Sequence, residues 1–249
     1  MNSLENKVAL VTGGGSGIGR ATSLLLSREG SKVIVADILF EAAKQVAEEI
    51  HREGGSAYGL MVDVTQRASI QRMIQEARSR SGQIDILVNI VGGSTPKSVL
   101  EMDESDWDRT LDLNLKSVFL CCSSVLGFMV ERSYGKIVNL SSAQAFSGAP
   151  LRAAYAAAKG GVVGFTKSLA LEVARLGISV NAVAPGLVAT ERVRAMHSEE
   201  EWQKAIASRP TGRAVSPEEV ARVVLFLVQD GQSSITGQTI HVNGGALMW

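Results

Sequence analysis

Seven short apolar runs, each followed by a longer stretch of mixed polarity, dominate the sequence. The runs are 7–12, 32–37, 57–64, 84–89, 135–141, 178–185 and 238–245. They are rich in valine and isoleucine and continuously apolar, which is typical of parallel strands buried on both faces. The intervening segments, such as 41–53 and 66–80, have the length and pattern of helices. We therefore expect an α/β protein with one doubly wound domain, a seven-stranded parallel sheet and helices on both faces.

Composition narrows the class of protein further. The 25 basic and 25 acidic residues balance without a basic block, which argues against nucleic acid as a partner. We find neither a signal-peptide core nor an 18-residue apolar run, so we expect no membrane partner. The two cysteines, Cys121 and Cys122, are adjacent, and the histidines lack metal-ligand spacing. These features predict a reduced, cytoplasmic protein without a metal site.

A glycine-rich segment, TGGGSGIG, follows the first apolar run directly at residues 12–19. Its G-x-x-x-G-x-G spacing differs from the common G-x-G-x-x-G pattern. Both patterns offer a pyrophosphate a tight turn, bare backbone and the amides of a helix N-terminus. A flexible turn is the simpler alternative, but the position after the first strand favours a nucleotide site of the Rossmann type. The residues assigned to this site are Gly13, Ser16, Gly17, Ile18 and Gly19.

The second apolar run ends in Asp37. A carboxylate there can accept hydrogen bonds from the adenosine ribose hydroxyls and would repel a 2′-phosphate. Neither Ser16 nor Ile38 supplies a cation for that phosphate. We therefore expect NAD rather than NADP, with Asp37 and Ile38 beside the adenosine, although an aspartate at a strand end can also merely begin a turn.

A tyrosine and a lysine stand four residues apart in the alanine-rich segment AYAAAKGG, residues 154–161. Alanine is the strongest helix former, so Tyr155 and Lys159 are expected on one face of a helix. Such a pair arises by chance on many surface helices. Alone, it does not predict a function.

Seven segments together make the chain resemble the short-chain dehydrogenase/reductase family along its whole length. They occur in the family's order: TGGGSGIG, DILVN, DLNLKS with its asparagine Asn114, IVNLSS, YAAAK, VNAVAPGLVAT and ITGQTIHVNGG. The resemblance implies an NAD-dependent oxidoreductase that transfers a hydride between nicotinamide and a secondary alcohol or its ketone. No linker or compositional break divides the chain, so residues 1–249 are expected to form one NAD-binding and catalytic domain. The irregular, polar stretch 188–211 within it is predicted to be a substrate lid, with an added subdomain as the alternative.

The resemblance implies roles for four catalytic residues. Tyr155 would be the acid/base. The Lys159 cation and the positive nicotinamide of the oxidised cofactor would together lower the pKa of the phenol, and Lys159 would also reach the nicotinamide ribose. Ser142 would hold the substrate oxygen, with its neighbour Ser141 as the alternative. Asn114 would hold a water of a proton relay through its backbone.

The same resemblance implies further cofactor contacts. Asp63 and Val64 match residues that bind the adenine. Where the family usually reads N-N-A-G, this chain has Asn-Ile-Val-Gly at 89–92, and we expect altered packing there but no loss of activity. The backbone of Val188 and the hydroxyl of Thr190 would bind the nicotinamide carboxamide. Besides Tyr155 and Lys159, the implied contacts are Asp63, Val64, Asn89, Gly92, Pro185, Gly186, Val188 and Thr190.

The substrate is less constrained by the sequence. Three loops are expected to face it: 93–99, 143–152 and 187–210. Gln144 and Arg152 are candidate contacts. Together with Arg152, the cations Lys97, Arg192 and Arg194 are compatible with an anionic substrate, but solvated surface cations are common and are the slightly preferred explanation. Apolar residues in the same loops would equally suit an alicyclic or steroid-like alcohol.

Assembly into a homotetramer is expected from two features. The helices around 104–131 and 152–175 carry apolar residues on more than one face and pair between subunits in the family that the chain resembles. The C-terminal residues Met248 and Trp249 are too apolar for a free tail and are expected at a subunit interface.

Two other functions stay open at this point. One is a 3-oxoacyl thioester reductase acting on acyl carrier protein or coenzyme A esters, although Asp37 argues against an NADPH-dependent form. The other is a non-catalytic NAD-binding scaffold or sensor. Such a protein would be expected to have lost one of Asn114, Ser142, Tyr155 and Lys159, and this chain retains all four.

Overall fold

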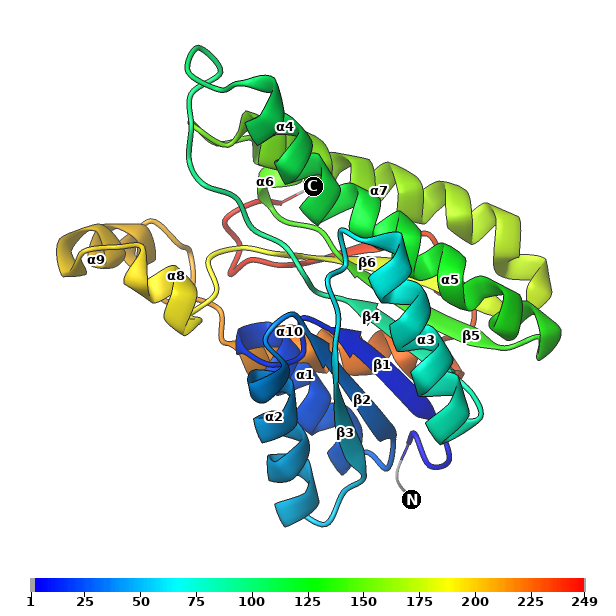
Figure 1. Cartoon of the computed structure of the whole chain (residues 1–249). Helices are drawn as coiled ribbons and strands as arrows, with labels where there is room; N and C mark the ends of the chain where they lie inside the picture. The colour runs from blue at the N-terminus through cyan, green and yellow to red at the C-terminus, as the bar shows by residue number, and fades with distance from the viewer. Residues whose placement is uncertain (1–2, 249) are drawn as a thin grey trace.

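Seven parallel strands form one sheet in the order β3-β2-β1-β4-β5-β6-β7 in the computed structural model, which describes residues 3–248 (Figure 1). All neighbouring strands are parallel, and the order reverses between β1 and β4. The strands lie within the seven apolar runs, so the expected doubly wound fold is confirmed. They are β1 Val8–Thr12, β2 Lys32–Asp37, β3 Ala57–Met61, β4 Ile86–Asn89, β5 Gly135–Leu140, β6 Ile178–Pro185 and β7 Thr239–Val242.

Helices cover both faces of this sheet (Figure 1). One face carries α1 Gly17–Arg28, α2 Phe40–Arg52 and α10 Pro217–Val228. The other carries α3 Arg67–Ser81, α5 Ser117–Glu131 and α7 Ala153–Val173. Shorter helices lie near the carboxyl ends of the strands: α4 Glu104–Leu111, α6 Gln144–Ser147, α8 Glu191–Ala195 and α9 Glu199–Ala207. Helices α8 and α9 lie within the stretch 188–211 and project from the body in Figure 1, and the role of this stretch as a substrate lid stays a prediction.

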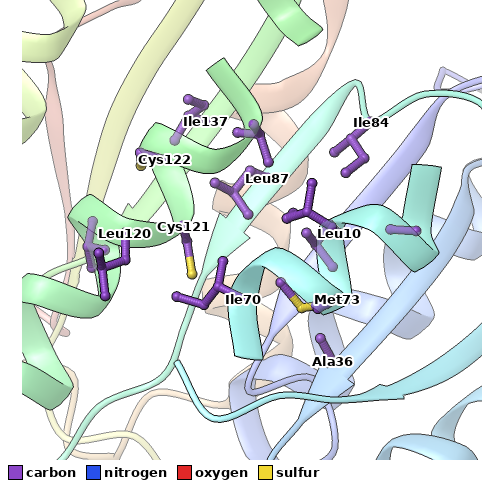
Figure 2. Close-up of a cluster of buried hydrophobic side chains, with 14 of the residues drawn as sticks. Leu10, Ala36, Ile70, Met73, Ile84, Leu87, Leu120, Cys121, Cys122 and Ile137 are labelled. Carbon is purple, nitrogen blue, oxygen red and sulfur yellow. The ribbon is translucent and has the colours of Figure 1, made fainter. Parts of the chain in front are cut away.

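An apolar cluster fills the space on each side of the sheet. In the cluster of Figure 2, Leu10 and Leu87 of the sheet pack with Ile70 of α3 and Cys121 of α5. The second cluster joins the opposite face to α1, α2 and α10. Because both faces of the strands are buried, their sequences show no polar alternation.

The two cysteines belong to the first cluster and are free thiols. Burial raises the pKa of Cys121 to about 12. A thiol that stays protonated at neutral pH is a weak nucleophile and reacts slowly with disulfides. These cysteines are therefore packing residues.

One helical stretch corrects the expectation that no segment is long and apolar enough to cross a membrane. Residues 104–131, which comprise α4, the π-helical turn η1 Asp112–Lys116 and α5, pass that test by length and composition. Val118, Cys122 and Met129 of this stretch are buried in the first cluster. Core helices pass the same test, so the stretch is weak evidence for a membrane span.

Candidate active site

Tyr155 and Lys159 lie one turn apart at the start of α7. The Nζ of Lys159 is 5.9 Å from the centroid of the Tyr155 ring, so the two side chains are neighbours, as their spacing predicts. Lys159 is only 2% exposed, and its Nζ donates to the carbonyl oxygen of Leu140 at 2.7 Å. Burial lowers the pKa of Lys159 to about 7, and the positive charge of Arg192 acts in the same direction.

The serines after β5 have different environments. Ser142 lies beside Tyr155 and forms a hydrogen bond with it. The hydroxyl of Ser141 instead donates to the carbonyl oxygen of Lys159 at 2.9 Å. Since that bond commits the Ser141 hydroxyl to the backbone of α7, the geometry favours Ser142 as the residue that would face a reacting oxygen.

The pKa of Tyr155 is raised by burial. The hydrogen bond with Ser142 and the charges of Arg192 and Arg152 oppose this effect without cancelling it. The predicted lowering of the phenol pKa includes the positive nicotinamide of the oxidised cofactor, so it stays a prediction for the cofactor-bound protein. A lysine with a pKa near 7 is only partly charged at neutral pH, which weakens its effect on the phenol.

Asn114 lies in the π-helical turn η1 and is completely buried. Its Nδ2 donates to the carbonyl oxygens of Gly93 at 2.8 Å and Thr110 at 2.9 Å, and its Oδ1 accepts from the Gly93 amide at 2.9 Å. Short π-helical turns often occur at functional sites. Here the turn positions a side chain that holds the loop after β4, and the predicted relay through the Asn114 backbone stays a prediction.

Gly92 lies where this loop meets both Asn114 and Lys159. A Cβ at this position would be 2.7 Å from the Oδ1 of Asn114 and 2.9 Å from the Nζ of Lys159. Any larger residue would therefore displace one of the two side chains. The loop can pass this close to the lysine only as glycine.

Asn89 lies in β4, and its side chain points into the protein rather than toward the loop. Its Nδ2 donates to the Oδ1 of Asn139 at 2.9 Å and to the Sγ of Cys122 at 3.4 Å. Its Oδ1 is buried and has no hydrogen-bond partner among residues 3–248. A cofactor contact at Asn89 would therefore come from its backbone.

The glycine loop packs closely between β1 and α1. Gly13 and Gly17 adopt positive φ angles of 69° and 49°, and a Cβ at Gly19 would lie 1.9 Å from the carbonyl oxygen of Gly13. Helix α1 begins at Gly17, and the side chain of Ser16 does not cap it. Bare backbone followed by uncapped helix amides fits the pyrophosphate of a dinucleotide.

Asp37 ends β2 beside this loop. Its Oδ2 accepts from the Gly15 amide at 3.0 Å, and its Oδ1 accepts from the Leu39 amide at 3.1 Å. The next residue, Ile38, is 63% exposed. A fixed carboxylate followed by an exposed apolar residue fits an adenosine ribose with a free 2′-hydroxyl.

Asp63 and Val64 follow β3, two and three residues after its last residue. The Oδ1 of Asp63 accepts from the amide and hydroxyl of Thr65 at 2.9 and 2.7 Å, and Val64 is buried. Since β3 adjoins β2, these residues lie on the same side of the sheet switch point as Asp37. Their predicted contact with the adenine stays a prediction.

The segment after β6 connects the sheet to α8. The carbonyl oxygen of Pro185 accepts from the Ala143 amide at 2.9 Å, and the Gly186 amide donates to β7. Val188 pairs with Val215. Thr190 caps α8, because its Oγ1 accepts from the Val193 amide at 3.2 Å. The methyl group of Thr190 also approaches Gly17, so this segment lies against the glycine loop.

A cleft of about 610 Å³ opens beside Tyr155. The loop after β4, helix α4, the start of α7 and Arg192 of α8 line it. Arg152, a predicted substrate contact, is among the lining residues. Gln144 is not, and its amide donates to the Oγ of Ser142 at 3.2 Å. The contribution of α4, through Asp106 and Arg109, was not predicted.

The comparisons with known proteins cover nearly the whole chain. A family model described as enoyl-(acyl carrier protein) reductase matches residues 13–246. The subunit BbsD of (2S)-[(R)-hydroxy(phenyl)methyl]succinyl-CoA dehydrogenase from Thauera aromatica is 38% identical, with 97% of both chains covered. The 3-oxoacyl-[acyl-carrier-protein] reductase FabG of Aquifex aeolicus is 44% identical, with 97% of this chain and 98% of the relative covered.

A solved structure gives the same result. The crystal structure of gox2181 superposes with a TM-score of 0.94 at 36% identity and covers 99% of this chain and 97% of its own. The fold is thus shared over nearly the whole of both chains, and 36% of the aligned residues are identical.

Proposed function

The chain belongs to the short-chain dehydrogenase/reductase family, and from that premise we propose that it is an NAD(H)-dependent oxidoreductase that interconverts 3-oxoacyl and 3-hydroxyacyl thioesters. The observation that carries this proposal is that Tyr155, which neighbours Lys159 and forms a hydrogen bond with Ser142, lines a cleft of about 610 Å³. Several relatives are named as 3-oxoacyl thioester reductases. They favour this reaction over the wider class of secondary alcohols that the sequence analysis placed first.

The residues that would hold the dinucleotide lie along the carboxyl ends of the strands. The glycine loop would receive the pyrophosphate, Asp37 the adenosine ribose, and the segment from Pro185 to Thr190 the nicotinamide. When bound, the nicotinamide accepts or supplies the hydride. The preference for NAD over NADP rests on the Asp37 carboxylate, which two backbone amides hold in place.

The proton would be moved by Tyr155. In the reductive direction its phenol donates to the carbonyl oxygen of the substrate, and the Ser142 hydroxyl donates a second hydrogen bond to the same oxygen. A raised pKa keeps the phenol in its acid form at neutral pH. In the oxidative direction Tyr155 must lose that proton, and the positive charges of Arg192 and Arg152 favour this. Lys159, with a pKa of about 7, can take up and release a proton near neutral pH.

The outer faces of α5 and α7 support the expected homotetramer. Phe119 and Leu171 are 45% and 85% exposed on these helices. Gly127 and Gly164 are also exposed, and a Cβ at either position would meet no atom within 4 Å. Glycine destabilises a helix interior by about 1 kcal/mol relative to alanine. Its presence on two exposed, partly apolar faces fits the close approach of a second copy.

Two further expectations bear on the partners and the compartment. Met248 is 75% exposed, so it is available for a subunit contact, whereas Trp249 lies outside the described residues. The buried free thiols are compatible with the reduced cytoplasm. We keep the cytoplasm as the proposed compartment.

The proposal is tested by following NADH and NADPH absorbance with three substrates: a 3-oxoacyl coenzyme A ester, the same acyl group on acyl carrier protein, and a simple ketone of similar size. We expect turnover of at least one thioester, with NADH preferred and the ketone much slower. Turnover of the ketone alone would contradict the thioester reaction and indicate a general carbonyl reductase. NADH binding without any turnover would indicate the non-catalytic scaffold.

A further inference from the structure

The cleft beside Tyr155 is lined by more positive than negative charge. Lys97, Arg109, Arg152 and Arg192 line it, against the single carboxylate of Asp106. Asp106 forms ion pairs with both Lys97 and Arg109. Within the described chain, no carboxylate pairs with Arg152 or Arg192, so two guanidinium groups in the cleft are left without a counter-charge.

These two arginines hold the same short loop. Arg192 comes from α8, and its Nη1 donates to the carbonyl oxygen of Gly92 at 3.0 Å. Arg152 precedes α7, and its Nη1 donates to the carbonyl oxygen and hydroxyl of Ser94 at 2.8 and 2.9 Å. The anchor points are two residues apart, so the guanidinium groups converge on one loop beside the reacting residues.

Each guanidinium uses only one of its three nitrogens for these bonds. The Nε and Nη2 of Arg152 and Arg192 have no hydrogen-bond partner among residues 3–248. Arg194, which lies two residues from Arg192 on the same helix, is instead paired with Glu199. The sequence singles out Arg152 as a candidate substrate contact but does not separate Arg192 from Arg194, whereas in the structure Arg194 is paired and Arg152 and Arg192 line the cleft.

We propose that Arg152 and Arg192 together bind a carboxylate that the substrate carries close to its reacting carbon. A planar guanidinium matches a carboxylate through paired hydrogen bonds, and the two groups present their unused N–H donors to one cleft. The charges of both arginines reach Tyr155, which places the anion near the alcohol carbon. The inference rests on the proposed function, in which Tyr155 transfers the proton.

The position of the charges argues against the phosphates of coenzyme A as the anion. A long pantetheine arm separates those phosphates from the thioester, and the reacting carbon lies beyond the thioester. Groups that act on Tyr155 are therefore close to the acyl chain. The carboxylate has two possible sources: the far end of a dicarboxylic acyl thioester, or a free hydroxy acid without a thioester.

The test compares kcat/KM for three substrates of the intact enzyme. These are 3-hydroxyglutaryl-CoA, 3-hydroxypentanoyl-CoA of equal chain length, and free 3-hydroxybutyrate. The wild-type protein is expected to prefer a carboxylate-bearing substrate by about tenfold or more. In Arg152→Met and in Arg192→Met, that preference should fall by about 10- to 100-fold, mainly through KM, because charge-assisted hydrogen bonds are lost. The control Arg194→Met should keep the wild-type preference.

The outcomes separate this inference from the proposed function. Turnover of both thioesters at equal kcat/KM by the wild-type protein would overturn the carboxylate site and leave the thioester reaction intact. Turnover of free 3-hydroxybutyrate without either thioester would support the site and overturn the thioester reaction. Equal losses on 3-hydroxyglutaryl-CoA and 3-hydroxypentanoyl-CoA in the variants would show that the arginines only brace the loop. The wild-type comparison decides the question even where a variant fails to fold.

Discussion

The ammonium nitrogen of Lys159 lies 2.7 Å from the carbonyl oxygen of Leu140 in an almost fully buried position. No carboxylate within residues 3–248 pairs with it, so the lysine has a neutral carbonyl oxygen as its hydrogen-bond acceptor and no counter-charge. Burying a cation without a counter-charge is unfavourable. The lowered pKa of Lys159 reflects this, and the proposed catalytic lysine therefore destabilises the fold that holds it.

Lys159→Met is expected to stabilise the protein at neutral pH. The ordinary pKa of 10.5 applies to the unfolded chain, and the folded value is about 7. As pH falls from 10.5 to 7, the unfolded chain binds a proton that the folded chain does not, so the fold loses stability across this range. Removing the amine should raise the free energy of unfolding at pH 7 by roughly 2–4 kcal/mol, after the lost hydrogen bond is allowed for.

Denaturant unfolding at pH 7 and pH 10 without nucleotide checks this prediction. The difference in the free energy of unfolding between the variant and the wild type should be smaller at pH 10. At that pH, burying the uncharged wild-type lysine requires the loss of fewer protons on folding. The exposed Lys167→Met serves as the control and should change little at either pH. A variant that is less stable than wild type at pH 7 would contradict the assignment of a buried, largely uncompensated lysine.

Tyr155→Phe is expected to lower kcat by about a hundredfold or more, since it removes the proton that is transferred. The phenyl ring preserves packing, so NADH binding, measured by fluorescence titration, should be unchanged. The matched control is Tyr134→Phe, because the Tyr134 hydroxyl bonds to Asp230 on the surface. Near-normal turnover by the Tyr155 variant would rule out the acid/base role.

Asp37→Asn should shift cofactor preference toward NADP. The amide retains an oxygen that can accept from the Gly15 or Leu39 amide, while the charge that repels a 2′-phosphate is lost. We expect the ratio of kcat/KM for NADPH to that for NADH to rise about tenfold or more, a gain of roughly 1.4 kcal/mol. Asp63→Asn, at the predicted adenine contact, should affect both cofactors alike. A ratio that stays constant in the Asp37 variant would place the ribose elsewhere.

Gly164→Arg is expected to break the assembly without unfolding the subunit. The position is open in the single chain, and arginine favours a helix over glycine by roughly 0.8 kcal/mol. A long charged side chain would, however, obstruct a second copy packed against α7. Sedimentation equilibrium should show a smaller species than wild type. Gly231→Arg, at another open position, is the control, and an unchanged mass for the Gly164 variant would move the interface away from this face.

Much of the fold was predictable because its signals are local. The continuously apolar runs mark strands buried on both faces, and helices α2 and α3 begin and end within one residue of the segments 41–53 and 66–80. The Tyr155 and Lys159 spacing placed both side chains on one face of α7. Each of these inferences depends on neighbours in the sequence, where periodicity carries the information.

The cleft was harder to predict because it is built from distant segments. Arg192 contacts Gly92, 100 residues away, and no local pattern signals that contact. The part of the cleft formed by α4 depends on how that helix crosses α7. The lowered pKa of Lys159 depends on burial by several elements at once. Gln144 follows Ser142 closely in the sequence, yet it lies outside the cleft because the chain turns into α6.

The π-helical turn at Asp112–Lys116 joins α4 and α5, two parts of one continuous helix that have different roles. On its amino-terminal side α4 lines the cleft, and on its carboxyl-terminal side α5 packs in the core. Each α-helical residue advances the rotation by about 100°. Deleting one residue from the turn would therefore rotate Asp106 and Arg109 away from the cleft while leaving Cys122 in the core. The length of this turn thus sets which side chains of α4 face the cleft, independently of how α5 packs in the interior.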